Sequence, residues 1–260
     1  MLAIPGWLIL IGAAPFVGSL GGVLYRRLPA GRPVVLARSE CESCGAILSA
    51  AELVPVLSFL ALRGRCRSCG TRIAPYHLAA ELSAVAVAAA AAWWLGPAAP
   101  GWALAGGAVL GWTALLLAAI DLRHMRLPDV LTLPLLLGGL LVAVPAEGGP
   151  DGVGPHAAAA AIGYGAFRLL AFGYRRLRGR DGLGQGDAKL FAAAGAWLGP
   201  APMPATLLLA ALLTLLLAGA AILAAGRDRW RADLPIPFGP GLAAACWLFW
   251  MWNTAAAVAA

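Results

Sequence analysis

The sequence predicts an all-α integral membrane protein with about eight transmembrane helices and a small cytoplasmic insertion between the first two. Three observations support this fold class. Hydrophobic residues make up 61% of the 260 residues and charged residues only 12%, whereas charged residues run near 25% in soluble domains. The apolar residues occur in blocks of about the length that crosses a bilayer. Cationic residues are confined to every second connection between those blocks.

The apolar blocks place the expected helices in order along the chain. They cover roughly residues 1–25, 82–120, 130–146, 156–174, 204–225 and 236–260. The second block is divided into two spans by the Gly-Pro-Ala-Ala-Pro-Gly segment at 96–101. No cationic segment precedes the first block, so we expect a retained helix there and not a removable signal peptide.

The distribution of charge predicts the orientation. All nineteen Lys and Arg residues fall in four segments, which are 26–72, 123–126, 168–189 and 227–231. The other connections carry none. Because cationic loops are retained in the cytoplasm, the two kinds of connection alternate sides if eight spans are present and both termini face outward. The distribution of the net charge of +7 therefore indicates membrane orientation and not binding to nucleic acid or acidic lipid. Membrane lipid is an expected partner because of the apolar spans.

The sixth span is the shortest, because only about ten apolar residues follow Lys189 before the first of three prolines in 200–204. The cationic segments on both sides of residues 190–225 require an even number of crossings between them. We therefore expect a hairpin of two helices that turns at the prolines, since proline disfavours helix interiors. The sixth helix would begin near Gly186 and carry Asp187 to the membrane edge.

Four of the five cysteines form two Cys-x-x-Cys knuckles, Cys41/Cys44 and Cys66/Cys69, each followed by glycine. Two such knuckles at this spacing are typical of a tetrahedral structural zinc site. Two disulfides are the alternative, although thiols on the cytoplasmic side stay reduced. The Zn²⁺ would hold together an insertion, residues 26–77, that is too small to be stabilised by its own core. The fifth cysteine, Cys246, is interpreted as a packing residue in the last span.

Two aspartates are candidate catalytic residues, because ionisable groups at the ends of membrane spans are functional candidates. Asp121 follows the apolar run 103–120, and Asp187 ends the segment Gly184-Gln-Gly186-Asp187. Both lie at cytoplasmic helix ends in the expected topology, so they can meet. Two carboxylates that share one proton form an aspartic-protease pair. A solvated helix cap or an ion pair with a nearby cation is the alternative for each residue taken alone.

Five segments in this order resemble the type IV prepilin leader peptidases over nearly the whole chain. They are Gly18-Ser19 with the following Tyr25-Arg26-Arg27-Leu28-Pro29, and residues 52–69, 120–134, 184–190 and 235–240. The resemblance implies an aspartic endopeptidase with Asp121 and Asp187 as the catalytic pair. Its substrates would be type IV prepilins or pseudopilins, cut after a glycine. Many relatives also N-methylate the new terminal residue with S-adenosylmethionine, an activity linked to the insertion.

The resemblance extends to supporting residues. Gly184 and Gly186 would let an extended substrate approach the first turn of the sixth helix, and Asp129 belongs to the first catalytic motif. Lys189 would either stabilise an ionised Asp187 or reach the lipid headgroups. Glu52 falls on the acid of the family's Glu-x-x-Pro segment and is the methyltransferase candidate, with a solvated surface glutamate as the alternative.

Two departures from the family pattern affect the neighbourhood of these sites. Glu42 stands where relatives often have proline after the first cysteine, which affects knuckle geometry without removing a ligand. Arg123 stands where many relatives have a second acid, so position 123 is not assigned to the site.

The expected organisation is a first helix (1–25), the zinc insertion (26–77) and a peptidase core (78–260), in the inner membrane of a bacterium with insertion and catalytic residues on the cytoplasmic side. Three other functions are weighed against this one. A transporter would have acids near the bilayer midplane and related halves. A methyltransferase alone gives no role to the two aspartates. A membrane aspartic protease with other substrates differs only in what it cuts, and the oligomeric state is left open.

Overall fold

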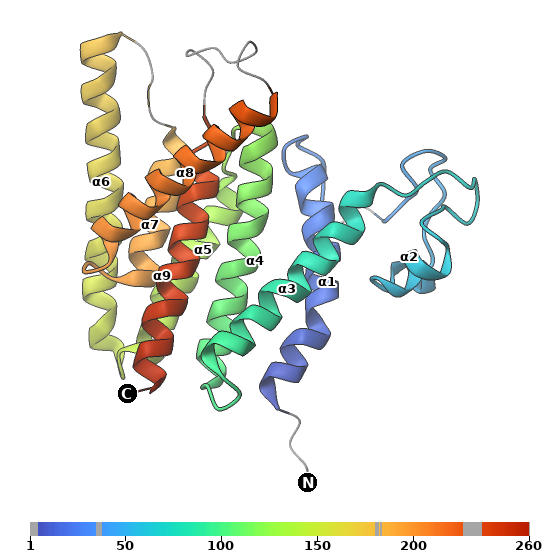
Figure 1. Ribbon diagram of the computed structural model, residues 1–260, viewed down its shortest axis with the longest axis horizontal. Helices are drawn as coiled ribbons and strands as arrows, with labels where there is room; N and C mark the ends of the chain where they lie inside the picture. The colour runs from blue at the N-terminus through green and yellow to red at the C-terminus, as the bar shows by residue number, and fades with distance from the viewer. Residues whose placement is uncertain (1–4, 35–37, 180–181, 183, 226–235, 260) are drawn as a thin grey trace. The chain divides into compact units, whose positions relative to one another are not determined.

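The computed structural model describes residues 5–34, 38–179, 182, 184–225 and 236–259, and in this part of the chain all regular elements are helices (Figure 1). The all-α fold class is therefore confirmed. The elements are α1 (Gly6–Arg27), η1 (Ala50–Leu53), α2 (Leu57–Ala61), α3 (Pro75–Leu95), α4 (Gly101–His124), α5 (Asp129–Ala146), η2 (Pro150–Gly152), α6 (Val153–Arg178), α7 (Gln185–Leu198), α8 (Met203–Ala225) and α9 (Gly239–Ala259).

Eight of these helices correspond to the eight spans expected from the sequence. Seven are long and apolar enough to cross a membrane, namely α1, α3, α4, α5, α6, α8 and α9. The remaining one, α7, has 14 residues, which at ~1.5 Å per residue is about 21 Å long and shorter than a hydrocarbon core of ~30 Å. It forms the expected hairpin with α8, and the chain turns between Leu198 and Met203.

The chain forms two compact units, Met1–Ala108 and Val109–Ala260, and each is described by itself. In the first unit, α1 packs against α3. Gly18 of α1 lies against the backbone of α3, because a Cβ at this position would be 2.5 Å from the carbonyl oxygen of Ala80 and from the Cα of Glu81. A larger residue at position 18 would therefore push the two helices apart.

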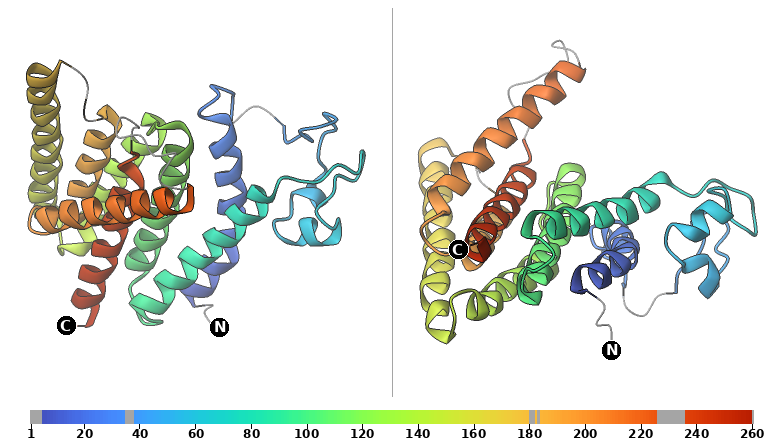
Figure 2. Two further views of the ribbon diagram at one scale, coloured as in Figure 1. Left: turned by 45° about the horizontal axis from the view of Figure 1, so that its top comes forward. Right: turned by 60° about the horizontal axis from the view of Figure 1, so that its bottom comes forward.

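In the second unit, α7 lies at the centre and packs against α5, α6 and α9. This helix is short and rich in alanine, and every residue from Leu190 to Leu198 is buried. Figure 2 shows α8 crossing the other long helices of this unit at a steep angle, and α8 packs on α9. The short α7 is thus enclosed by longer helices and is not itself required to span the membrane.

Polar contacts fix the C-terminal end of α7. The indole Nε1–H of Trp197 donates to the backbone oxygen of Leu135 in α5 at 2.8 Å. Nδ1 of the buried His156 in α6 is 2.9 Å from the backbone oxygen of Ala196, and its Nε2 is 3.5 Å from the Glu147 carboxylate. These contacts hold one end of α7, and Asp187 lies in the first turn at the other end.

One packed glycine of α7 and one exposed glycine of α6 provide a test of this arrangement. A Cβ at Gly195 would lie 2.7 Å from the backbone of Ala159 and Ala160 in α6, whereas a Cβ at Gly165 of α6 would meet nothing within 4 Å. We expect Gly195→Ala to destabilise the protein by about 1–3 kcal/mol through overpacking. Gly165→Ala should be neutral or slightly stabilising because alanine is the better helix former. Thermal denaturation of both variants in detergent micelles measures the difference, and equal midpoints would contradict this packing.

Candidate functional site

Asp121 lies in the last turn of α4 with 6% of its surface exposed. Its Oδ2 accepts a hydrogen bond of 3.1 Å from the backbone N–H of Gly239, the first residue of α9. Helix N-termini bind anions because their first N–H groups lack partners within the helix. A Cβ at position 239 would be only 2.6 Å from Oδ2. The close approach of the carboxylate to the helix therefore requires glycine at this position.

Asp187 occupies the first turn of α7, where its carboxylate turns back toward the N-cap residue Gly184. A Cβ at position 184 would be 2.7 Å from Oδ2 of Asp187, so this carboxylate lies close to the backbone of Gly184. The charge of Asp121 acts directly on Asp187. The two carboxylates therefore belong to one electrostatic site, formed by the end of α4 and the beginning of α7.

Leu127 joins the helix ends around the two acids. A Cβ at Gly186 of α7 would be 2.8 Å from the Cβ of Leu127, and a Cβ at Gly239 of α9 would be 3.3 Å from its Cδ2. The same buried leucine thus contacts the first turns of α7 and α9 beside Asp121. Figure 1 shows the C-terminal ends of α4 and α6 on the same side of this unit as the beginning of α5.

Lys189 pairs with Asp129 and not with the two acids of the site. Its Nζ is 2.5 Å from Oδ1 of Asp129, the first residue of α5. The sequence left two roles open for Lys189, which were an interaction with Asp187 or with lipid headgroups. In the structure its charge is neutralised by Asp129, and this ion pair fastens α5 to α7 two residues after Asp187. Among the residues described, no cation pairs with Asp121 or Asp187.

The four cysteines of the two knuckles come together in the first unit. The Sγ atoms of Cys41, Cys44, Cys66 and Cys69 all lie within 4.8 Å of one another, and those of Cys41 and Cys69 are 3.9 Å apart. Sulfurs that share a tetrahedral zinc at ~2.3 Å lie about 3.8 Å from each other. The cluster therefore has the size of a metal site with four thiolate ligands.

The two knuckles have the same backbone geometry. In the first, the N–H of Cys41 donates to Ala46 at 2.8 Å and that of Gly45 donates to Cys41 at 2.9 Å. The second repeats both bonds, from Cys66 to Thr71 and from Gly70 to Cys66, at the same lengths. The glycines adopt φ angles of +70° and +72°, a region that favours glycine. The sequence signal of a glycine after each knuckle thus has a conformational cause.

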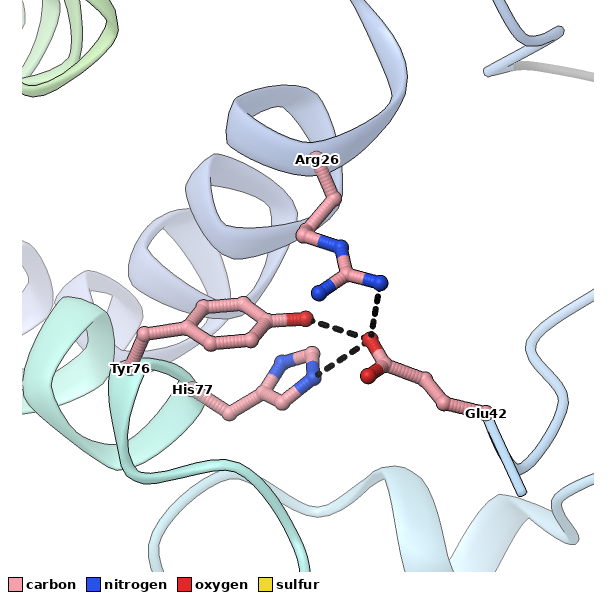
Figure 3. Close-up of polar contacts among 4 residues, drawn as sticks. All are labelled: Arg26, Glu42, Tyr76 and His77. Carbon is pink, nitrogen blue, oxygen red and sulfur yellow. Dashed lines mark hydrogen bonds and ion pairs between the residues drawn. The ribbon is translucent and has the colours of Figure 1, made fainter. Parts of the chain in front are cut away.

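Glu42, one residue after the first cysteine, ties its knuckle to the helices of the same unit (Figure 3). The Tyr76 hydroxyl donates to its Oε1 at 2.6 Å. Nη2 of Arg26 lies 3.4 Å and Nε2 of His77 lies 3.7 Å from the same oxygen. The departure from the family pattern noted at position 42 therefore supplies an acid that is held by the end of α1 and the beginning of α3.

A cavity of about 790 Å³ lies in the first unit, between these helix ends, the knuckles and α2. Glu52 is on its wall. The Ser49 backbone N–H donates to Oε2 of Glu52 at 2.9 Å and the Ser49 hydroxyl donates at 2.7 Å. These two hydrogen bonds lower the pKa of the Glu52 carboxyl. Glu52 is thus a capping residue of η1 that also faces the cavity.

The comparison with known proteins identifies the family. The Type IV leader peptidase family matches residues 108–219, and the Bacterial Peptidase A24 N-terminal domain matches residues 11–95. A protein of Aeromonas hydrophila is 40% identical over 220 residues, which are 85% of this chain and 73% of the relative. The chain belongs to the type IV leader peptidase family. Both units of the structure carry a match, and the match to the peptidase family includes Asp121 and Asp187.

Two further relatives agree with this membership of the leader peptidase family. A protein of Burkholderia pseudomallei (strain 1026b) is 44% identical over 84% of this chain and 68% of the relative. One of Xanthomonas campestris pv. campestris is 35% identical over 88% of this chain and 77% of the relative. All three relatives are named prepilin leader peptidase/N-methyltransferase. The comparison with solved structures gave no significant match.

Sequence reasoning missed several contacts of these sites. The N–H of Gly239 on Asp121 was not predicted, although the segment 235–240 had been noted as a family resemblance. The pairing of Lys189 with Asp129 and the cluster around Glu42 were missed too. Each joins positions far apart in the sequence, so only the helix packing brings the partners together.

The cysteine cluster gives a measurable expectation. Purified full-length protein should contain about one tightly bound metal ion per chain, and Cys44→Ser should lose most of it because three thiolates hold the ion less well. Cys246→Ala is the matched control, since this buried cysteine lies in α9 outside the cluster. Elemental analysis by mass spectrometry measures both. Equal metal content in the two variants, or none in the unmodified protein, would contradict the assignment.

Proposed function

We propose that this chain is a membrane-embedded aspartic endopeptidase that removes the leader peptides of type IV prepilins and pseudopilins, cutting after a glycine. The observation that carries the proposal is the meeting of two carboxylates, Asp121 and Asp187, in one electrostatic site at neighbouring helix ends. The names of the relatives supply the substrate class.

In the proposed reaction the two carboxylates share one proton, because close like charges disfavour the doubly ionised state. The ionised carboxylate takes a proton from water as it attacks the scissile carbonyl carbon, and the protonated one donates to the carbonyl oxygen. The leaving amine then receives a proton as the C–N bond breaks. The N–H of Gly239 donates only to Asp121, and we therefore place the negative charge of the resting pair on Asp121.

The glycines beside the acids favour an extended substrate. Gly184 is exposed and Gly186 half-buried in the first turn of α7. A peptide backbone can approach Asp187 there without meeting a side chain. Positioning residues complete the site, since the ion pair of Lys189 with Asp129 holds the first turn of α7 against α5.

A second proposed activity is N-methylation of the newly exposed terminal residue with S-adenosylmethionine, as the relatives' names include N-methyltransferase. In this step the amine nitrogen, having lost a proton, forms a bond to the methyl carbon. The bond from that carbon to sulfur breaks, and its electron pair stays on the sulfur. The retained insertion with its cavity is the proposed place, and Glu52 on the cavity wall is the candidate residue.

We assign zinc to the cysteine cluster as a structural ion of the insertion 26–77, since four thiolates leave no open coordination position. The core 78–260 carries the peptidase pair. The last turn of α4 carries Arg123. The last turn of α6 carries Arg175, Arg176 and Arg178. Because such ends stay in the cytoplasm, the acids face the cytoplasmic side of the inner membrane.

The aspartate pair is tested by conservative substitution. Asp121→Asn and Asp187→Asn should each reduce prepilin cleavage by at least ~10³-fold, since either loss removes the shared proton chemistry. The control Asp151→Asn changes an exposed acid in η2 at another part of the unit and should cleave normally. Co-expression with a prepilin followed by mass spectrometry measures both the leader and the N-methyl group. Normal cleavage by either variant, in protein that is folded in the membrane, would remove that residue from the mechanism.

A further inference from the structure

Four glutamates line the cavity of the first unit, and their surroundings differ. Glu42 is paired with Arg26 and receives the Tyr76 hydroxyl. Glu52 receives two donors from Ser49, and Glu40 is exposed on the surface. The negative charge of these three is therefore matched by a cation, by hydrogen bonds or by solvent.

The fourth acid, Glu81, has neither a paired cation nor substantial contact with solvent among the described residues. It is 8% exposed, and one hydrogen bond reaches it, a backbone N–H from Val56 to Oε2 at 2.7 Å. No cation pairs with it among the residues that the structure describes. Burying a carboxylate without a counter-charge costs free energy. Because Glu81 lies on the cavity wall, a positively charged group bound in the cavity could supply that counter-charge.

The backbone at both ends of the hydrogen bond between Val56 and Glu81 is constrained. Gly18 of α1 lies directly behind the Cα of Glu81, so the backbone of α3 is fixed there. Val56, which donates the hydrogen bond, has φ +61° and ψ −53°, which is an outlier for a β-branched residue. Such a conformation persists only where its surroundings enforce it, and it is frequent at ligand sites.

We propose that this cavity binds S-adenosylmethionine and that Glu81 is the counter-charge of its sulfonium group. This inference rests on the proposed methyl transfer. The volume of about 790 Å³ lies within the ~300–1,000 Å³ of small-molecule sites. The rings of Phe59, Tyr76 and His77 on the wall offer apolar faces for the adenine.

The charge of the ligand changes in the reaction, and the carboxylate of Glu81 would interact with the charged donor more strongly than with the neutral product. In methyl transfer the positive charge moves from sulfur to the amine nitrogen and leaves with a proton. The product, S-adenosylhomocysteine, has the same adenosine and amino-acid parts but a neutral thioether. A carboxylate that pairs with the sulfonium should therefore affect the donor and not the product, whereas a purely structural residue affects both alike.

The experiment measures the Kd of both ligands by titration calorimetry with purified full-length protein in detergent. Glu81→Gln keeps an oxygen to accept the Val56 N–H and removes only the charge. In this variant the Kd of S-adenosylmethionine should rise about tenfold relative to that of S-adenosylhomocysteine, the size expected for the loss of one charge-assisted contact. The Kd of S-adenosylhomocysteine itself should stay within about twofold of its value in the unmodified protein. Glu40→Gln, which removes an exposed charge from the same cavity wall, should leave the ratio of the two Kd values unchanged.

The other outcomes separate the two proposals. If Glu81→Gln weakens both ligands equally, or leaves the ratio as it is, Glu81 is not the counter-charge and the inference is overturned. The inference is also overturned if Glu40→Gln shifts the ratio of the two Kd values as much as Glu81→Gln does. The shift would then come from the total negative charge around the cavity and not from Glu81. If the unmodified protein cleaves prepilin but binds neither ligand, the proposed methyl transfer itself fails.

Discussion

The burial of α7 is the constraint on which the peptidase site depends. A helix of about 21 Å cannot satisfy a bilayer by its own length, so it lies between α5, α6 and α9. Its C-terminal end is fixed by Trp197 and by the backbone contact with His156. Its first turn is fastened by the ion pair of Lys189 with Asp129. Asp187 is therefore presented from a rigid element, and the precision of the site comes from helix packing.

Most of the fold could be predicted from the sequence, because the positions of the membrane spans follow from local patterns of apolar residues. Seven helices lie where the apolar blocks predicted them, and α7 lies where the alternation of cationic segments and the prolines predicted a hairpin with α8. The clustering of four cysteines followed from the spacing of two knuckles. In each case the signal is contained within a short segment of the chain.

The contacts that define the chemistry could not be predicted in the same way. The N–H of Gly239 reaches an acid 118 residues away, and Glu81 receives a hydrogen bond from a residue 25 positions earlier. Neither partner is marked by its residue type, since one donor is a backbone amide of glycine and the other of valine. The burial of Glu81 without a cation follows from the packing of α1 on α3 and not from a local sequence pattern.

The attachment of Glu42 beside Cys41 links metal loading to the interior of the insertion. Cys41 and Cys66 are ligands in the proposed site and also form part of the cavity wall. Oxidation of the thiols or chelation of the ion would free the knuckle, and with it the acid that Arg26 and Tyr76 hold. Oxidising conditions would thus disturb the cavity of the first unit and leave the aspartate pair of the second unit with its own helix contacts. Under thiol stress such an enzyme would release trimmed pilins that lack their terminal methyl group.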